Sequence, residues 1–137
     1  CSSDLQTTYG NPPMPSNKLI KCKYKGQEAV IGTSGEVESC AAIEKWIKGG
    51  CKGKPKLPDE PQYAAMIVTK DGDIFLMSGS TFPHEMGKVK WAIGSGCDYA
   101  LGAMAAGKTA KEAVEIASTL DVGTGLGVDV VVLKGRK

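Results

Sequence analysis

The chain is poor in the residues that usually bind metals. It contains one histidine, His84, and five cysteines that are widely spaced and form no C-x-x-C pair. These side chains do not make up any of the usual zinc ligand sets. An odd number of scattered cysteines also argues against a disulfide framework. We therefore expect no metal site, and we interpret Cys22, Cys40 and Cys51 as buried or unreactive thiols.

The chain also lacks long apolar runs and an excess of charge. No stretch approaches the length of a transmembrane helix, and residues 1–4 resemble neither a signal peptide nor a targeting segment. The 17 basic and 15 acidic residues leave a net charge of +2, which gives no tendency to bind nucleic acid or membranes. We therefore expect a cytoplasmic protein with neither kind of partner. Its 137 residues, 42% of them hydrophobic, predict a single domain over residues 1–137.

What the sequence does have is a clearly patterned stretch from Trp91 to Leu133. Its short apolar run, residues 91–93, predicts a strand that breaks at Gly94-Ser95-Gly96. Residues 97–106 are rich in helix formers and are followed by Gly107, a residue that commonly ends helices. The first half of the stretch is therefore predicted to be a strand, a tight turn and a helix.

A second helix is predicted directly afterwards. Thr109 stands three residues before Glu112, which is the spacing of a capping box, and apolar residues recur behind it at helical intervals. Asp121 ends this helix, and a loop with three glycines leads into residues 128–133, which are β-branched enough to form a buried strand. The order of elements is strand, helix, helix, strand.

The first half of the chain shows a different pattern. Residues 1–17 are polar and rich in turn formers, which excludes a central strand. Residues 18–31 predict a hairpin that turns at Lys25-Gly26, and a glycine turn at residues 32–35 leads into a helix over residues 37–47. This is again a strand, a glycine turn and a helix.

A second hairpin follows a basic, proline-containing loop at residues 51–62, which we interpret as a solvated linker. Residues 63–77 predict this hairpin, with Asp71-Gly72 in its turn, and residues 78–88 are expected to be irregular. Strands that follow one another in hairpins predict antiparallel sheets with helices packed on a face, which is an α+β fold.

The turn at Gly94-Ser95-Gly96 does not continue into a dinucleotide-binding fingerprint. Tyr99 stands where the third glycine of G-x-G-x-x-G is required for close packing. We therefore expect no cofactor. Without further context this segment is simply a tight turn.

Two longer motifs resemble a known superfamily. They are A-I-G-S-G-x-x-Y-A-L-G-A-M at residues 92–104 and T-A-K-E-A-V-E-I-A-S-T-L-D-x-x-T-G at residues 109–125. The stretch resembles the C-terminal half of proteasome β-type subunits and of the bacterial proteasome-like protease, and still more the short phage and prophage members. These proteins are N-terminal-nucleophile hydrolases. The resemblance implies an αββα-type sandwich of antiparallel sheets with helices on the outer faces.

The chemistry of this superfamily needs a terminal nucleophile that attacks an amide while a nearby base takes its proton. A lysine lowers the nucleophile's pKa, and a backbone N–H at a glycine turn stabilises the oxyanion. The resemblance implies that Lys18 is this lysine and that Gly35 supplies the oxyanion amide. Asp4 matches the acidic partner of the lysine.

The motifs of the second half supply further candidates. The resemblance assigns Cys97 to the place where many members have a serine that supports the nucleophile's amine. Asp121 matches the aspartate of the loop after the second helix. Thr124 matches the small hydroxyl residue that follows this aspartate.

The start of the chain departs from the superfamily pattern. A member's nucleophile opens an apolar strand, and a second strand follows before the acidic residue, whereas Cys1 is followed at once by a polar, proline-containing segment. Either the chain lacks the first strand pair, together with a nucleophile that is usually threonine, or Cys1 is itself the nucleophile. We favour the first interpretation because a catalytic residue must be held by a rigid element.

The predicted function is that of a proteasome-like threonine-type or Cys1 peptidase acting on peptide or protein substrates. The resemblance also implies a homo-oligomeric ring and an unfoldase partner, although residues 48–62 form only a short linker where larger relatives have a long helix. The first alternative is a catalytically inactive shell or interaction subunit with the same fold. A second alternative is a small-molecule binding module that uses the glycine turns.

Overall fold

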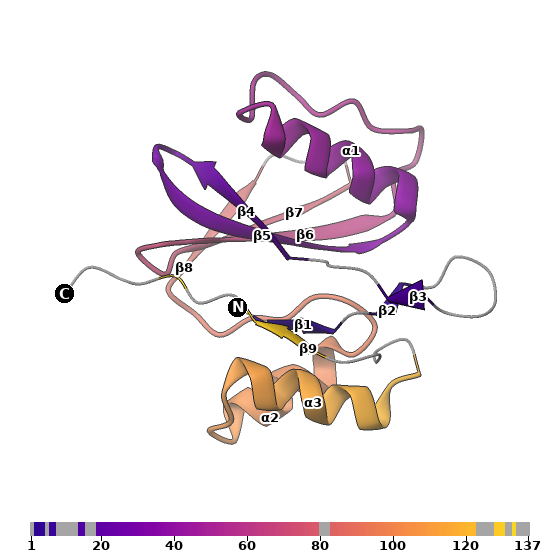
Figure 1. Ribbon diagram of the computed structural model, residues 1–137, viewed down its shortest axis with the longest axis vertical. Helices are drawn as coiled ribbons and strands as arrows, with labels where there is room; N and C mark the ends of the chain where they lie inside the picture. The colour runs from indigo at the N-terminus through magenta and orange to yellow at the C-terminus, as the bar shows by residue number, and fades with distance from the viewer. Residues whose placement is uncertain are drawn as a thin grey trace. The chain divides into compact units, whose positions relative to one another are not determined.

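The computed structural model in Figure 1 describes residues 2–4, 6–7, 14–15, 19–79, 83–122, 128–130 and 133. The described residues form an α+β structure with the following elements in chain order: β1 (Ser2–Asp4), β2 (Gln6–Thr7), β3 (Met14–Pro15), β4 (Leu19–Tyr24), β5 (Gln27–Gly35), α1 (Val37–Lys48), β6 (Tyr63–Thr69), β7 (Ile74–Ser78), β8 (His84–Gly87), α2 (Cys97–Ala105), α3 (Ala110–Leu120) and β9 (Val128–Val130).

These elements fall into two compact units. The described residues of Ile20–Val89, with Leu133, form the first, which we call the sheet unit. Those of Lys90–Val132 together with Cys1–Leu19 form the second, the helix-pair unit. Among the described residues, no helix has both the length and the apolar character that crossing a membrane requires.

The sheet unit is built on a five-stranded antiparallel sheet in the order β4-β5-β6-β7-β8. The β4–β5 turn has positive φ angles at both central residues, 48° at Lys25 and 77° at Gly26, as a type I′ hairpin turn requires. The next long pairing runs from Ala29 opposite Thr69 to Gly35 opposite Tyr63. Strands β6 and β7 pair from Ala64 opposite Ser78 to Val68 opposite Ile74, so both predicted hairpins, and helix α1 between them, are confirmed.

Helix α1 covers one face of this sheet, as Figure 1 shows. Alternate residues of the strands point to this face, because side chains of a strand alternate between the two sides of the sheet. They meet the buried side chains of Ile43 and Ile47 on α1. The fully or nearly fully buried members of this core include Ile31, Ile67 and Phe75. The helix ends at Gly49, as its sequence predicts.

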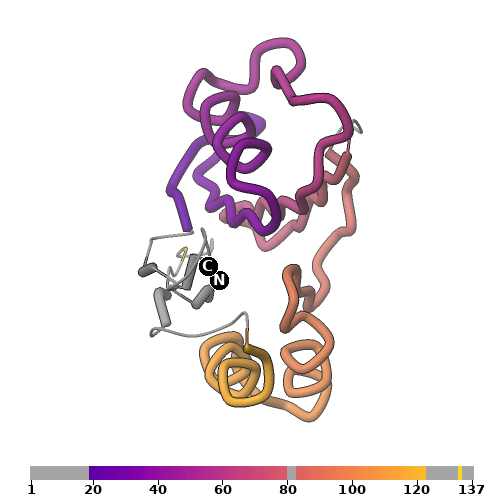
Figure 2. The backbone as a smooth tube through the Cα atoms, turned by 90° about the vertical axis from the view of Figure 1, so that its right-hand side faces the viewer, coloured from indigo at the N-terminus to yellow at the C-terminus, as the bar shows by residue number. Residues whose placement is uncertain are grey.

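The helix-pair unit contains α2 and α3, which lie side by side in Figure 2. Their shared core is small, consisting of Ala100, Met104, Ala113 and Ala117. Small side chains allow the backbones of two helices to approach closely. Strand β1 pairs with β9 in antiparallel fashion, and both strands contact α3.

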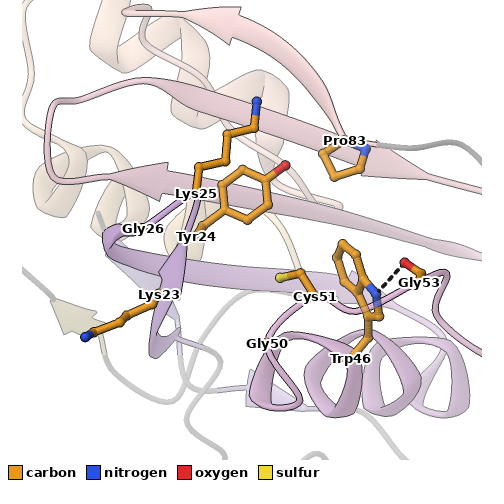
Figure 3. A pocket seen from close by; sticks show the side chains of 9 residues that line it. All are labelled: Lys23, Tyr24, Lys25, Gly26, Trp46, Gly50, Cys51, Gly53 and Pro83. Atoms are coloured by element: carbon orange, nitrogen blue, oxygen red, sulfur yellow. Dashed lines mark hydrogen bonds between the residues drawn. The ribbon is translucent and has the colours of Figure 1, made fainter.

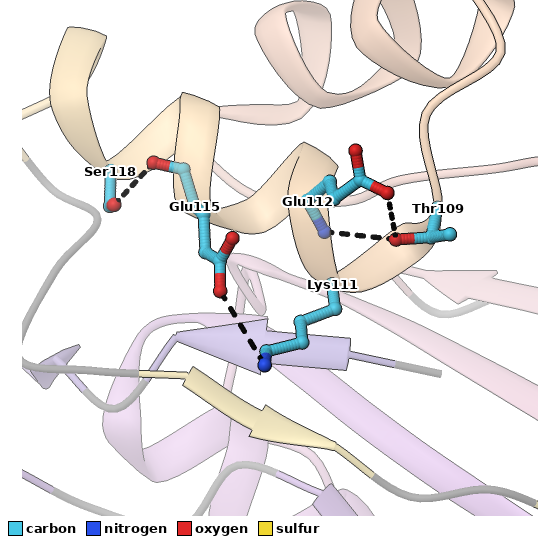
Figure 4. A network of polar contacts seen from close by, with 5 residues as sticks. All are labelled: Thr109, Lys111, Glu112, Glu115 and Ser118. Carbon is cyan, nitrogen blue, oxygen red and sulfur yellow. Dashed lines mark hydrogen bonds and ion pairs between the residues drawn. The ribbon is translucent and has the colours of Figure 1, made fainter.

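Helix α3 makes several local polar contacts, which Figure 4 shows. The Thr109 hydroxyl accepts a hydrogen bond from the Glu112 amide at 3.2 Å and donates one to the Glu112 carboxylate at 3.1 Å. Lys111 and Glu115 form an i,i+4 ion pair at 3.8 Å. The capping box predicted at Thr109 is therefore present.

Four expectations about the strands are corrected by the structure. Residues 91–93 are not a strand, because a three-residue apolar run forms one only where a neighbouring strand supplies hydrogen-bond partners. Residues 84–87, expected to be irregular, form β8 and pair with β7 through a bulge between Ile74 and Phe75. This short strand shows no apolar alternation, so its sequence carried no strand signal.

The other two corrections concern strand ends. Residues 32–35, expected to be a turn, continue β5 as far as Gly35 because each of them pairs with a residue of β6. The polar start of the chain contains short strands in two-stranded sheets, with Ser2–Asp4 paired to Val128–Val130, which does not contradict the prediction that it forms no central strand. The predicted last strand, residues 128–133, is present over Val128–Val130, whereas Leu133 is not in a strand.

Candidate functional site

The first candidate contact joins the turn before α2 to the end of α3. The Ser95 hydroxyl donates a hydrogen bond to Asp121 Oδ2 at 2.6 Å, across 26 residues of sequence. This length falls in the range of about 2.5–2.7 Å that is typical of hydroxyl–carboxylate hydrogen bonds, which are stronger than bonds between neutral groups. Asp121 is half-buried and Ser95 is exposed, so the pair lies at the surface of the helix-pair unit.

Local backbone geometry positions Ser95. Gly94 has a φ of 102°, which favours glycine, and the turn is closed by a hydrogen bond of 3.1 Å from the Cys97 amide to the Gly94 carbonyl. Gly96 then begins α2 without a side-chain cap. The sequence G-S-G therefore lets the chain reverse sharply and leaves the hydroxyl at the outside of the turn.

Asp121 is positioned by the end of α3. Its amide donates a hydrogen bond of 2.8 Å to the Ala117 carbonyl, and its own backbone is extended. A carboxylate at a helix C-terminus faces the negative end of the helix dipole, which disfavours its charge. The hydrogen bond from Ser95 offsets part of this cost. An unfavourably placed carboxylate with a dedicated donor is typical of a residue that has a role beyond helix stability.

Cys97 is the first residue of α2 and is half-buried. Its thiol lies 3.7 Å from Asp98 Oδ1, to which it donates. The hydroxyl bonded to Asp121 thus belongs to Ser95, a residue that sequence reasoning did not select. The signal that could have found it is its position between two glycines in the motif at residues 92–104.

Asp4 belongs to the same unit as Ser95 and Asp121. It is the last residue of β1, where it pairs with Val128, and β1 packs against α3. Only its backbone is described. Three other predicted site residues, Cys1, Lys18 and Thr124, lie outside the described residues, so their assignments stay predictions.

Gly35 ends β5 in the sheet unit, and its surroundings require glycine. Its φ is 122°, and a Cβ added there would lie 2.5 Å from the Gln62 carbonyl oxygen and 2.7 Å from the Tyr63 Cα. The next amide, that of Glu36, donates to the same Gln62 oxygen at 2.7 Å. Close packing of two backbones therefore explains this glycine, and its use as an oxyanion donor stays a prediction.

The predicted unreactive cysteines can be assigned to their surroundings. The thiols of Cys22, Cys40 and Cys51 are half-buried and pack against the core of the sheet unit. Burial raises the pKa of the Cys22 and Cys51 thiols above its ordinary value. Within the described residues, no three histidine, cysteine or acidic side chains are grouped as metal ligands would be.

Comparison with known proteins shows which solved structures have a similar fold. No protein-family model and no curated protein sequence matches the chain. Among solved structures, the BPH protein of Thiobacillus denitrificans has a TM-score of 0.64 and 19% identity, covering 93% of this chain and 88% of its own. Eukaryotic HslV from Trypanosoma brucei has a TM-score of 0.63 and 18% identity, with the same coverages of 93% and 88%. At these identities the likeness shows the fold, which is proteasome-like.

Proposed function

We propose that the protein is a proteasome-like peptidase that hydrolyses amide bonds with an N-terminal nucleophile. The observation that carries this proposal is the hydrogen bond between Ser95 and Asp121, on a fold like that of HslV, a proteasome-type threonine protease. A charged carboxylate and a hydroxyl, joined at the surface by a short hydrogen bond, can orient and hold an amine. We also propose that the complete architecture is an αββα sandwich.

The proposed roles follow from the chemistry. The nucleophile's oxygen or sulfur attacks the carbonyl carbon of the scissile bond, and its proton passes to a nearby amine that later protonates the leaving group. The Ser95–Asp121 pair holds that amine. Lys18, with Asp4 as its acidic partner, lowers the nucleophile's pKa, and the Gly35 amide stabilises the oxyanion. Thr124 supports the carboxylate of Asp121.

We propose that Ser95, rather than Cys97, takes the part of the serine that supports the nucleophile's amine. Ser95 donates to Asp121 at 2.6 Å, whereas the Cys97 thiol is directed to Asp98 at 3.7 Å. Thiols are also weaker hydrogen-bond donors than hydroxyls. Replacing Cys97 by Ala is therefore expected to reduce activity less than replacing Ser95.

The experiment is peptide hydrolysis by the native protein, with its N-terminus identified by intact mass. Ser95→Ala and Asp121→Asn should each lower kcat/KM by about 100-fold, which is the usual size of a lost proton-transfer contribution. Ser118→Ala and Asp98→Asn are matched controls on α3 and α2 and should retain activity. If Asp121→Asn retained full activity while the native protein hydrolysed peptides, the proposed site would be wrong.

Two further variants identify the nucleophile and test the inactive alternative. Labelling by an amide-mimicking electrophile should occur at the native N-terminal residue, and Cys1→Ala should abolish it only if Cys1 is the nucleophile. Lys18→Ala should abolish hydrolysis because it removes the cation that activates the nucleophile. A native protein that neither hydrolyses peptides nor is labelled would favour the inactive shell subunit instead.

The assembly is part of the same proposal. We propose a homo-oligomeric ring in the cytoplasm that works with an unfoldase. We also propose that residues 1–137 form a single domain and that the chain is most similar to the short phage members. Sedimentation velocity of the native protein would measure the number of subunits. A strictly monomeric protein would contradict the proposed ring.

A further inference from the structure

The sheet unit contains a pocket that the proposed peptidase function does not use. It has a volume of about 430 Å³ and lies between the β4–β5 turn, the C-terminal end of α1 and the first residues of the loop 51–62 (Figure 3). This volume falls within the range of ~300–1,000 Å³ that is usual for small-molecule sites. Its floor and walls are formed by Tyr24, Trp46, Cys51 and Pro83.

Tyr24 brings a hydroxyl group to the pocket. Its side chain is held edge-on against the ring of Phe75, with ring centroids 5.0 Å apart, and the residue is only 9% exposed. Its hydroxyl is not among the buried polar atoms that lack a partner in the described part of the chain, so it is accessible at the pocket. Burial raises the pKa of this hydroxyl, and the neighbouring Cys51 and Glu85 raise it further, so it remains a donor at neutral pH. A phenolic hydroxyl of this kind can donate a hydrogen bond to a ligand in the pocket.

Trp46 supplies a fixed apolar wall. Its indole nitrogen donates a hydrogen bond of 3.0 Å to the Gly53 carbonyl, which holds the orientation of the ring. Figure 3 shows the Tyr24 and Trp46 rings on the two sides of Cys51, with the Tyr24 hydroxyl directed toward Pro83. A planar ring can stack against such a wall.

The charges at the pocket favour an anion. Lys23 and Lys25 belong to its lining, and no carboxylate does among the described residues, although Figure 3 shows the Lys23 side chain directed away from the Tyr24 and Trp46 rings. The Lys25 ammonium lies 4.6 Å from the Phe75 ring centroid and 5.8 Å from that of Tyr24, which holds it at the rim of the pocket. Glu85, whose carboxylate acts on Tyr24, is the acidic group that opposes this preference.

We propose that this pocket binds a small aromatic anion. The ring of the ligand packs against Trp46, the Tyr24 hydroxyl donates a hydrogen bond to the ligand, and Lys25 pairs with its anionic group. A nucleoside monophosphate and an aromatic carboxylate share this chemistry, and the experiment below distinguishes them. The site does not depend on the peptidase proposal, because none of its residues belongs to that site.

Calorimetric titration of the full chain tests the proposal with four probes. AMP and naphthoate represent the two sources, while adenosine keeps a ring without an anion and inorganic phosphate keeps an anion without a ring. AMP, naphthoate or both should bind at least about tenfold more tightly than adenosine and phosphate, because each combines the two features. The proposal would be overturned if neither AMP nor naphthoate bound, or if neither of them bound more tightly than adenosine and phosphate.

Variants locate the binding. Tyr24→Phe keeps the ring and should weaken binding about fivefold by removing one hydrogen bond, and Lys25→Gln should weaken it similarly. Glu85→Gln should strengthen it. Tyr99→Phe and Lys45→Gln are exposed controls and should bind as the wild type does, with unchanged thermal unfolding confirming that every variant is folded. Binding that none of the pocket variants alters would also overturn the assignment.

Discussion

Among the described residues, the sheet unit buries large side chains, whereas the helix-pair unit buries mainly alanines. Ile31, Ile43 and Ile67 are completely buried in the first, and Ala113 and Ala117 are the most buried core residues of the second. Burial of a large aliphatic side chain stabilises a fold by about 1.5–3 kcal/mol, and an alanine contributes much less. The helix-pair unit must therefore depend more on close backbone packing and on local polar contacts.

The candidate contact therefore does not lie in the unit with the larger apolar core. The Ser95–Asp121 pair belongs to the unit with the smaller apolar core, where its two elements are held by caps, turns and ion pairs. Functional groups on such elements can be exposed without sacrificing a large core. Trp46 belongs to the sheet unit and Trp91 to the helix-pair unit. In single-tryptophan variants, the fluorescence of each therefore follows the unfolding of its own unit.

The largest effect is expected for Ile67→Ala in the sheet unit. Ile67 is 0% exposed in β6, so its truncation removes apolar contacts and leaves a cavity. The free energy of unfolding should fall by about 3 kcal/mol. Urea unfolding followed by Trp46 fluorescence measures it, with Val37→Ala, at a position 44% exposed, as the control. A loss no larger than that of the control would contradict the large-core description.

Ala113→Leu tests the close packing of α2 and α3. Ala113 is 1% exposed, so a larger side chain must push the two helices apart. We expect a loss of about 2 kcal/mol from overpacking. Unfolding followed by Trp91 fluorescence measures this loss, and Ala105→Leu on the exposed side of α2 is the matched control. A neutral result at Ala113 would mean that the pair is loosely packed.

Thr109→Ala tests how far local capping stabilises the helix-pair unit. The variant removes the acceptor of the Glu112 amide at the start of α3. The expected loss is about 1 kcal/mol, the typical cost of removing a helix N-cap. Thr119→Ala, in the last turn of the same helix, should cost less because its hydroxyl only returns to the Ile116 carbonyl. Equal effects at both positions would argue against a capping role.

Tyr63→Phe is expected to have a smaller effect of the opposite sign. The Tyr63 hydroxyl is buried in the sheet unit without a hydrogen-bond partner in the described structure. Removing an unsatisfied polar group while keeping the ring should leave the free energy of unfolding unchanged or raise it by up to about 1 kcal/mol. Trp46 fluorescence in urea measures this. A clear loss would show that the hydroxyl is satisfied after all, for example by an ordered water.

The smallest effect is a pH dependence at Glu112. The Thr109 hydroxyl, and then Lys108, hold the pKa of this carboxyl below its ordinary value of 4.5. The stabilisation by its charged form is therefore present above that value and is lost as pH falls through the lowered pKa. Wild type and Glu112→Gln should differ in stability near neutral pH and converge in acid, as measured by thermal unfolding. If the difference in stability between the two proteins instead grew in acid, the predicted direction of the pH dependence would be wrong.

Much of the fold could be predicted because its signals are local. Lys25-Gly26 and Asp71-Gly72 mark the hairpin turns, Gly49 ends α1, and Thr109 with Glu112 begins α3. Pairing partners could not be predicted in the same way. Residues 84–87 became a strand because β7 offered hydrogen bonds to pair with, and residues 91–93 did not, although the latter are the more apolar.

The candidate site was likewise predictable only in its local features. The sequence by itself determined that Asp121 follows a helix and that Ser95 stands in a glycine turn, because caps and turns depend on neighbouring residues. Only the tertiary structure decided that these two side chains meet, because the packing of α2 against α3 sets the distance between groups 26 residues apart. The tertiary structure likewise decided that Tyr24 lines a pocket, since its ring packs against that of Phe75.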